Sequence, residues 1–167
     1  MDLQVLIVDD NQHMRTILRE LLRAVGIREA REARDAVEAL DIMKTTSTDL
    51  VLVDLSMPVI DGVEFTYMVR TSSDSPNPYV PIIMITGHSA RSKVIAARDA
   101  GVNEFVAKPV TAKSLMQRLT AIVERPRPFV RTATYFGPDR RRKADPDYKG
   151  PFRRASDQEK ESEAVDI

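Results

Sequence analysis

The chain has 167 residues, and its 25 Lys and Arg side chains balance its 25 Asp and Glu side chains, so the formal net charge is zero. This length suits one domain of ordinary size with an appendage. The absence of cysteine excludes disulfide frameworks, cysteine-based zinc sites and thiol nucleophiles. Because no apolar run approaches the roughly 18 residues of a membrane span and no secretory signal opens the sequence, we expect a cytoplasmic protein.

Charge is distributed in three blocks along the chain. Residues 1–124 carry 14 basic and 17 acidic side chains, residues 125–154 carry 10 and 3, and residues 155–167 carry 1 and 5. Such blocks are typical of a domain followed by an interaction tail. We therefore expect a domain at 1–124, an arginine-rich tail at 125–157 and an acidic, disordered C-terminus at 158–167.

Within the first 124 residues, short apolar runs alternate with segments of helical periodicity. The apolar runs predict strands at Leu3–Val8, 27–33, Leu50–Val53, Pro81–Ile85 and Glu104–Ala107. The helical segments are Met14–Val25 with a stop at Gly26, a helix capped by Asp35, 63–71, 91–100 with a stop at Gly101, and Leu115–Val123. Residues 72–80 are rich in Ser and Pro and predict a loop. Five strands alternating with five helices indicate an α/β fold, a doubly wound parallel sheet covered on both faces.

In such a sheet, ligands bind beyond the carboxyl ends of the strands. The side chains expected there are three carboxylates, one hydroxyl and one amine: Asp9, Asp10, Asp54, Thr86 and Lys108. Each alone has a simpler explanation as a helix cap, a turn or a solvated loop residue. Together they converge on one rim. Clustered carboxylates repel one another unless a cation lies among them, and a site with few oxygen ligands favours Mg²⁺.

These residue types suit the transfer of a phosphoryl group to an aspartate. Asp54 would be the nucleophile, and the metal ion would neutralise the incoming charge. Lys108 would supply a second positive charge, and Thr86 would donate a hydrogen bond to a phosphoryl oxygen.

Residues 1–124 resemble a response-regulator receiver domain of the CheY type. The motifs that carry the resemblance are Asp9-Asp10 after the first strand, Asp54 after the third, Thr86 after the fourth and Lys108-Pro109 after the fifth. The resemblance implies a flavodoxin-like (βα)5 fold with Asp54 as phosphoacceptor. It implies Mg²⁺ ligands from Asp9, Asp10, Asp54 and the Ser56 carbonyl. It further implies Thr86 and Phe105 as a coupled switch pair and a cis peptide bond between Lys108 and Pro109.

Two features depart from the CheY pattern. His88 occupies a position that is variable in this family and that tunes dephosphorylation, and the loop at 72–80 is slightly longer than in CheY. Both leave the kinetics of phosphorylation open.

The tail has few aliphatic side chains, and five of the ten prolines lie between Pro126 and Pro151, which excludes long helices. The simplest interpretation is an extended, largely irregular, solvated segment. However, five of the nine aromatic residues lie in 125–154, and a motif repeats at a spacing of 13. Tyr135-Phe-Gly-Pro-Asp-Arg140-Arg141 recurs as Tyr148-Lys-Gly-Pro-Phe-Arg153-Arg154. The repeat suggests two half-sites for a ligand with internal symmetry.

The tail composition favours a purine nucleotide. Eight of the ten basic residues in 125–154 are Arg, whose planar group stacks on bases and binds the O6 and N7 atoms of guanine. The segments Arg142-Lys-Ala-Asp145 and Arg154-Ala-Ser-Asp157 each place an Asp three residues after an Arg. That Asp would accept hydrogen bonds from N1–H and N2–H₂ of guanine, and Tyr135 and Tyr148 would supply stacking faces.

Cyclic di-GMP is a two-fold symmetric ligand with two guanines and two phosphates. A receiver followed by such a tail resembles the Cle proteins, CheY-like cyclic di-GMP effectors of alphaproteobacteria. The resemblance implies ligand binding by the tail, with two nucleotides per chain, and a flagellar-motor switch partner to which the protein is recruited to control motility or attachment. The implied ligand-binding residues are Tyr135, Arg140, Arg141, Arg142, Asp145, Tyr148, Arg153, Arg154 and Asp157.

Three alternatives stay open. The first is an ordinary receiver that is phosphorylated by a histidine kinase or a phosphotransfer protein and whose tail docks only a protein. The second is a basic arm that binds DNA or RNA through phosphate contacts. Two features argue against it: the sequence has no helix-turn-helix or other folded nucleic-acid-binding motif, and the basic run is interrupted by Asp139, Asp145 and Asp147. A metabolic enzyme is least favoured, because the rim offers no further site. We expect a two-input signalling protein that is no enzyme and binds neither DNA nor membranes.

Overall fold

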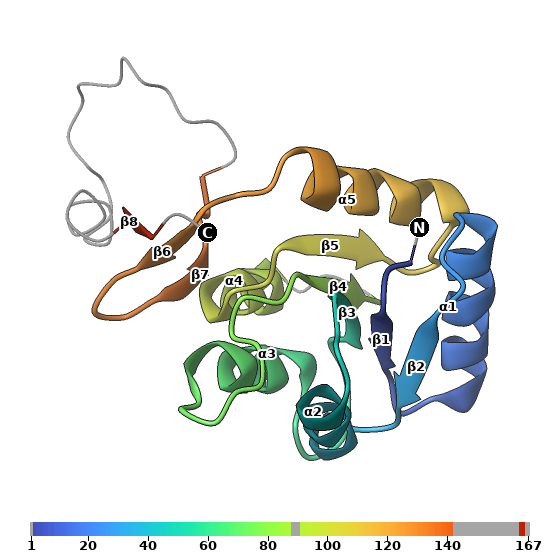
Figure 1. Ribbon diagram of the computed structural model, residues 1–167, viewed down its shortest axis with the longest axis horizontal. Coiled ribbons are helices and arrows are strands. Elements are labelled where there is room, and N and C mark those ends of the chain that lie inside the picture. The colour runs from blue at the N-terminus through green and yellow to red at the C-terminus, as the bar shows by residue number, and fades with distance from the viewer. Residues whose placement is uncertain (1, 88–90, 142–163, 166–167) are drawn as a thin grey trace.

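The computed structural model describes residues 2–87, 91–141 and 164–165. Its main sheet is parallel, with the strand order β2-β1-β3-β4-β5. The strands are β1 (Val5–Val8), β2 (Ala30–Ala33), β3 (Leu50–Asp54), β4 (Ile82–Thr86) and β5 (Glu104–Ala107). The helices are α1 (Gln12–Ala24), α2 (Ala36–Thr45), α3 (Gly62–Thr71), α4 (Arg91–Ala100) and α5 (Ala112–Glu124). The strands and helices alternate along the chain (Figure 1), which confirms the predicted doubly wound fold.

Each face of the sheet has its own apolar core. On one face, Leu18 of α1 and Leu115 of α5 pack against the strands. On the other, α2, α3 and α4 contribute a second core that includes the fully buried Phe65. Every residue of β3 and β4 is buried, as expected for central strands covered by helices on both sides.

Side-chain caps fix the helix starts that follow the strands. Asn11 accepts a hydrogen bond from the amide of Met14, and Asp61 accepts one from the amide of Glu64. Such caps satisfy amides that have no partner within the helix. As a result, α1 and α3 begin at fixed positions a few residues beyond β1 and β3, at the carboxyl rim of the sheet.

After α5 the chain folds back onto the domain. β6 (Phe129–Arg131) and β7 (Phe136–Pro138) form an antiparallel hairpin, and β8 (Ala164–Val165) pairs with β6. The hairpin lies at the end of the sheet where β5 begins, opposite the carboxyl rim (Figure 1). These residues belong to the predicted tail, where no strand was expected, because three-residue strands show no periodicity that could reveal them.

A buried arginine lies beneath the hairpin. Arg70 of α3 is 3% exposed, and its guanidinium lies 4.9 Å from the centre of the Phe129 ring of β6. Its acceptors are the carbonyls of Gly101, Pro78 and Val80 at 3.0, 2.8 and 2.7 Å and Asn103 Oδ1 at 2.9 Å. Burial lowers the pKa of Arg70 to about 9, which leaves the group charged at neutral pH.

Aromatic packing completes this contact. The rings of Tyr79, Phe129 and Phe136 lie with their centroids 5.3 to 5.6 Å apart. Gly137 allows β7 to come close, because a Cβ there would lie 2.9 Å from the Cα of Gly101. The hairpin therefore packs through apolar contacts over the hydrogen-bonded guanidinium of Arg70. This packing excludes water from the aromatic rings and from the buried charge.

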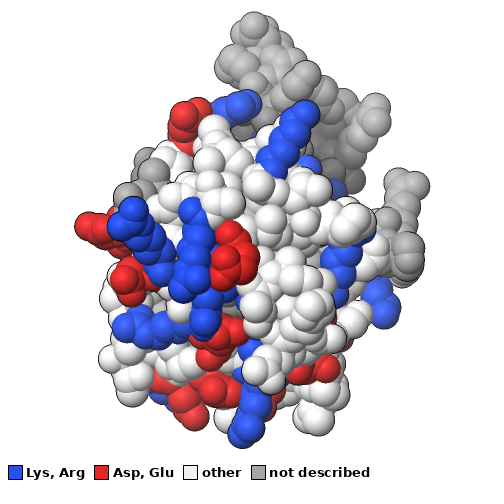
Figure 2. All heavy atoms as spheres, turned by 90° about the vertical axis from the view of Figure 1, so that its right-hand side faces the viewer, with Lys and Arg blue, Asp and Glu red and all other residues white. Residues whose placement is uncertain are grey.

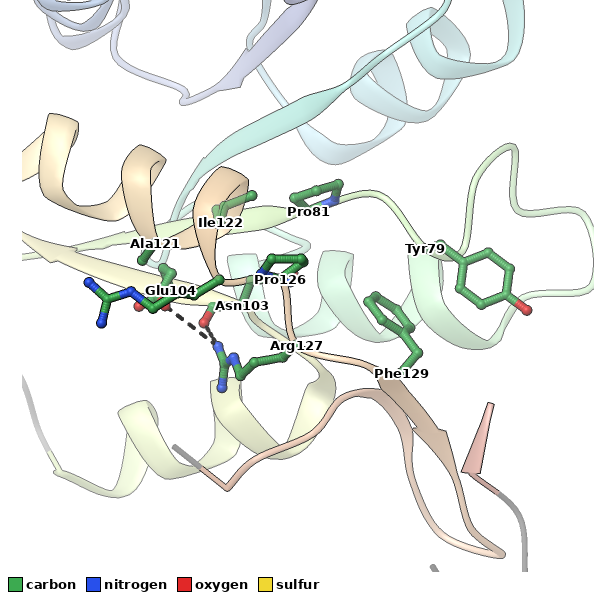
Figure 3. A pocket seen from close by; sticks show the side chains of 10 residues that line it. Tyr79, Pro81, Asn103, Glu104, Ala121, Ile122, Pro126, Arg127 and Phe129 are labelled. Carbon is green, nitrogen blue, oxygen red and sulfur yellow. Dashed lines mark hydrogen bonds and ion pairs between the residues drawn. The ribbon is translucent and has the colours of Figure 1, made fainter. Parts of the chain in front are cut away.

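An arginine ties each end of the hairpin to the domain. Arg127 donates to the Asn103 carbonyl and lies 3.8 Å from the Glu104 carboxylate (Figure 3). Arg140 forms an ion pair of 2.7 Å with Asp99 of α4. These contacts extend the packed structure beyond α5.

The face over α1 and β2 carries charges of both signs (Figure 2). Glu32 pairs with Arg15 at 3.4 Å and also with Arg19, and Arg23 pairs with Glu20 at 2.9 Å. Mixed signs give this face no strong field to attract a polyanion. Among the described residues, no helix is both long and apolar enough to cross a membrane.

We expect Arg70→Leu to lower the free energy of unfolding by about 2–4 kcal/mol, because buried carbonyls would lose their donor. Urea unfolding of the full chain measures this loss. Arg34→Leu is the matched control, since the Arg34 side chain is 78% exposed and its removal should change stability by about 0.5 kcal/mol or less. Equal losses in the two variants would contradict a structural role for Arg70.

Candidate functional site

The parallel register brings the ends of the strands together. Val8 of β1 pairs with Val53 of β3, so Asp9 and Asp54 follow at the same level of the sheet. Thr86 ends β4 and pairs with Ala107 of β5, after which Lys108 follows. The rim predicted from the sequence is thus formed as expected.

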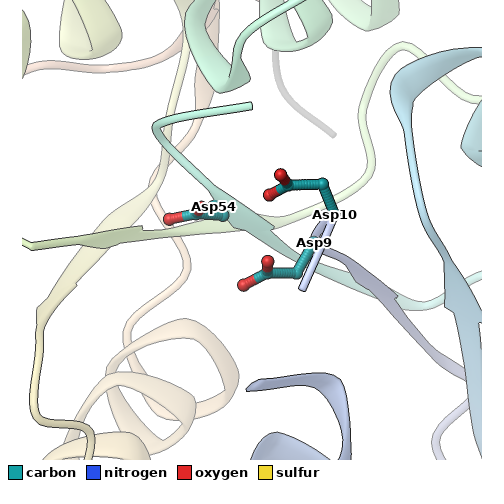
Figure 4. Close-up of side chains that lie close together, drawn as sticks. All are labelled: Asp9, Asp10 and Asp54. Carbon is teal, nitrogen blue, oxygen red and sulfur yellow. The ribbon is translucent and has the colours of Figure 1, made fainter. Parts of the chain in front are cut away.

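Three carboxylates converge at this rim (Figure 4). Asp9, Asp10 and Asp54 each offer an oxygen within 4.8 Å of the others. Asp9 and Asp54 are buried and Asp10 is exposed. Asp9 Oδ1 accepts from the Asn11 amide at 2.9 Å, whereas the buried Asp9 Oδ2 has no hydrogen-bond partner within the described structure. A buried unsatisfied oxygen beside two further carboxylates fits a hard divalent cation such as Mg²⁺.

The electrostatics of Asp9 agree with this interpretation. Burial, helped by the nearby Asp54 charge, raises the pKa of the Asp9 carboxyl to about 6, although the Asn11 amide and Lys108 oppose the shift. Without a cation, folding therefore places Asp9 where its charged form is disfavoured. A bound cation would remove this penalty.

Lys108 lies next to the predicted phosphoacceptor. Its Nζ is 3.1 Å from Asp54 Oδ1, and its amide donates to the Thr86 carbonyl at 2.7 Å. The Lys108–Pro109 peptide bond is cis, as the resemblance implied. The main chain thus holds the ammonium group over the Asp54 carboxylate, where it can also contact a group attached to that carboxylate.

The first residue of α3 requires glycine. A Cβ on Gly62 would lie 2.5 Å from the Asp54 carbonyl oxygen, and the Gly62 amide donates to the Leu55 carbonyl at 3.0 Å. The sequence predicts only a turn at Asp61-Gly62, since a close contact with residue 54 leaves no local signal. The close approach fixes the loop that carries Ser56. The role of the Ser56 carbonyl as a metal ligand stays a prediction.

The predicted switch pair lies on one face of the sheet. Phe105 pairs with Met84, which is two residues before Thr86, so the side chains of Thr86 and Phe105 point to the same side. Thr86 is buried, and Phe105 is half-buried against the core of α2, α3 and α4. This placement is compatible with coupling between them, and their switch role stays a prediction.

The structure describes three of the nine residues assigned to the nucleotide site. Tyr135 is 6% exposed and donates its hydroxyl to the Pro138 carbonyl at 2.6 Å, so it offers no open stacking face unless the hairpin leaves its seat. Arg140 is paired with Asp99, and Arg141 is exposed. Arg142, Asp145, Tyr148, Arg153, Arg154 and Asp157 lie outside the described residues, as does His88.

A family model of the response regulator receiver domain matches residues 5–120. The chain belongs to this family. It is similar to the chemotaxis protein CheY-3 of Vibrio cholerae, with 37% identity over 124 residues that cover 74% of this chain and 94% of that protein.

Solved receiver structures agree with the assignment. The crystal structure of Vibrio cholerae CheY4 aligns with a TM-score of 0.67 and 28% identity, covering 74% of this chain and all of that one. The receiver domain of the sensor histidine kinase PA1611 from Pseudomonas aeruginosa aligns with a TM-score of 0.63 and 28% identity, covering 72% and 96%. That receiver holds a magnesium ion in its active-site cleft. The match to the family model ends before the hairpin at 129–138.

The raised pKa of Asp9 predicts how its replacement changes stability. Between pH 3.8 and about 6 the folded state keeps a proton that the unfolded state releases, so this group lowers stability as the pH rises. At pH 7.5 with chelator, we expect Asp9→Asn to unfold at a higher urea concentration than the native chain. Its free energy of unfolding should be higher by on the order of 2 kcal/mol.

This difference should shrink as the pH falls toward 4, and excess Mg²⁺ should stabilise the native chain far more than the variant. Urea unfolding at the two pH values, with and without Mg²⁺, measures both effects. A variant less stable than the native chain at pH 7.5 in chelator would contradict the buried-charge penalty.

Proposed function

We propose that this receiver accepts a phosphoryl group at Asp54 from a histidine kinase or a phosphotransfer protein, and that it acts as a signalling switch and not as a metabolic enzyme. The supporting observation is the Asp54 carboxylate, which is 5% exposed and lies 3.1 Å from Lys108 Nζ, beside the unsatisfied oxygen of Asp9.

The residues at the rim have distinct roles in this transfer. An Asp54 carboxylate oxygen forms a bond to phosphorus while the bond to the donor breaks, and the donor leaves with that electron pair. Lys108 compensates the charge of the phosphoryl oxygens, and the Thr86 hydroxyl donates a hydrogen bond to one of them. Asp9, Asp10, Asp54 and the Ser56 carbonyl would hold Mg²⁺, which supplies further charge neutralisation when bound.

Acetyl phosphate labelling tests this proposal. We expect Asp54→Asn to abolish labelling in the presence of Mg²⁺, because an amide is a poor nucleophile and carries no negative charge. Asp41→Asn, which changes an exposed aspartate on α2, should label like the native chain. Persistent labelling of Asp54→Asn would identify another acceptor.

As a second function, we propose that the tail binds cyclic di-GMP and that the receiver, once loaded, engages a flagellar-motor switch protein. The supporting observation is the repeated motif with its two Arg-x-x-Asp segments, Arg142–Asp145 and Arg154–Asp157. The similarity to a chemotaxis protein favours a role in motility or attachment, in the cytoplasm or at the motor. The competing proposal is a tail that docks a protein or nucleic acid without the dinucleotide.

Calorimetric titration with cyclic di-GMP, and with GTP as the control ligand, separates these proposals. We expect the full chain to bind near two cyclic di-GMP molecules, and Arg154→Ala to weaken binding by about tenfold or more, because a bidentate arginine contact with guanine is lost. Arg23→Ala, on the mixed-charge face, should leave binding unchanged.

A shortened control chain should end after Arg141 and not at residue 124, because the longer form keeps the hairpin that covers Arg70. Absence of binding by the full chain would exclude the dinucleotide and favour a tail that docks a protein.

A further inference from the structure

A groove separates the hairpin from the ends of α3 and α4. Its volume is about 300 Å³, and it is lined by Tyr67, Arg70 and Thr71 of α3, Asp99 and Ala100 of α4, and residues 131–136 of the hairpin. This volume lies at the lower end of the range for ligand sites. It suits one base with its phosphate better than a whole dinucleotide.

The hairpin wall offers a cation. Arg131 is exposed, and its guanidinium lies 4.3 Å from the centre of the Phe136 ring, which restricts its motion. Within the described part of the chain, it forms no ion pair with a carboxylate. A restricted, uncompensated guanidinium is a suitable partner for a phosphate.

The helix wall offers an aromatic ring and an acceptor. Tyr67 is 59% exposed, so a large part of its ring faces solvent. The side chain of Asp99 is 48% exposed although its Oδ1 pairs with Arg140, so the carboxylate can accept further hydrogen bonds. Because α3 and α4 both end here, the negative ends of their dipoles also favour donor groups over phosphate. The N1–H and N2–H₂ edge of guanine is such a donor group.

The tail leaves from the edge of this groove. Asp99 lines the groove and pairs with Arg140 at 2.7 Å, and Arg141, the next residue, is the last one described before residues 164–165. The proposed tail site, with Arg142 and Arg154, is therefore connected to the groove through the chain at Arg141. A ligand held by that segment would be present at high effective concentration beside Tyr67 and Arg131.

We propose that this groove is the receiver's own part of the cyclic di-GMP site. It takes one guanine, stacked on Tyr67 with its N–H edge toward Asp99, while the adjoining phosphate binds Arg131. The proposal rests on the proposed tail function and adds to it a guanine-nucleotide subsite on the folded domain. Bound ligand would then bridge the hairpin to α3 and α4.

Titration of full-length variants with cyclic di-GMP tests the subsite. We expect Tyr67→Ala and Arg131→Ala each to raise the dissociation constant by about tenfold, through loss of stacking and of the phosphate contact. Tyr67→Phe keeps the ring and should stay within about twofold of the native value. Arg34→Ala removes a positive charge on an exposed side chain elsewhere and should have no effect beyond about twofold.

Amide hydrogen exchange of β6 and β7 shows whether the hairpin stays in place in each variant. Weaker binding with unchanged exchange supports the subsite. If Arg131→Ala loosens the hairpin, the affinity of Tyr67→Ala alone tests the subsite, because Tyr67 lies on α3 and not in the hairpin. Native affinity in Tyr67→Ala and Arg131→Ala would overturn the subsite and leave the tail proposal intact. A native chain that does not bind cyclic di-GMP would overturn both.

Discussion

The parallel register of β1 and β3 places two buried carboxylates, Asp9 and Asp54, side by side at the rim of the sheet. Burial and the neighbouring Asp54 charge favour protonation of Asp9 or a bound cation, and Lys108 offsets only part of this effect. The functional rim is therefore a region where folding alone leaves an electrostatic penalty. A bound metal ion, and the phosphorylation proposed for Asp54, would both act on that penalty.

A second buried charge organises the opposite end of the molecule. Arg70 is satisfied by main-chain carbonyls and by Asn103, and the Phe129 ring of the hairpin covers it. The same helix serves both ends, because α3 begins at Gly62 against Asp54 and carries Arg70 in its last turn. A ten-residue helix thus forms a direct physical link between the acidic rim and the seat of the hairpin.

The sequence was sufficient to predict the five strands, the five helices and the acidic rim, because apolar periodicity and strand-end residues are local signals. The hairpin could not be predicted in this way, since the surface on which it packs is built from residues far apart in the sequence. Arg70, for example, donates a hydrogen bond to Gly101, 31 residues away. For the same reason Tyr135 looked like a stacking face, although it is buried against the domain. Neither Tyr67 nor Asp99 belongs to a sequence motif, and the groove that they line forms only beside the folded hairpin.

The close fit around Gly137 limits how the C-terminal extension could be moved between proteins. β7 can pack on the domain only where residue 101 is also small. The packing surface also includes the buried arginine at position 70 and the acid at position 99. A chimaera that grafts residues 125–167 onto another receiver would carry the arginines without their anchor. The hairpin at 129–138 and the domain that supports it therefore form one structural unit, so a transferred hairpin would need these partner residues in its new domain.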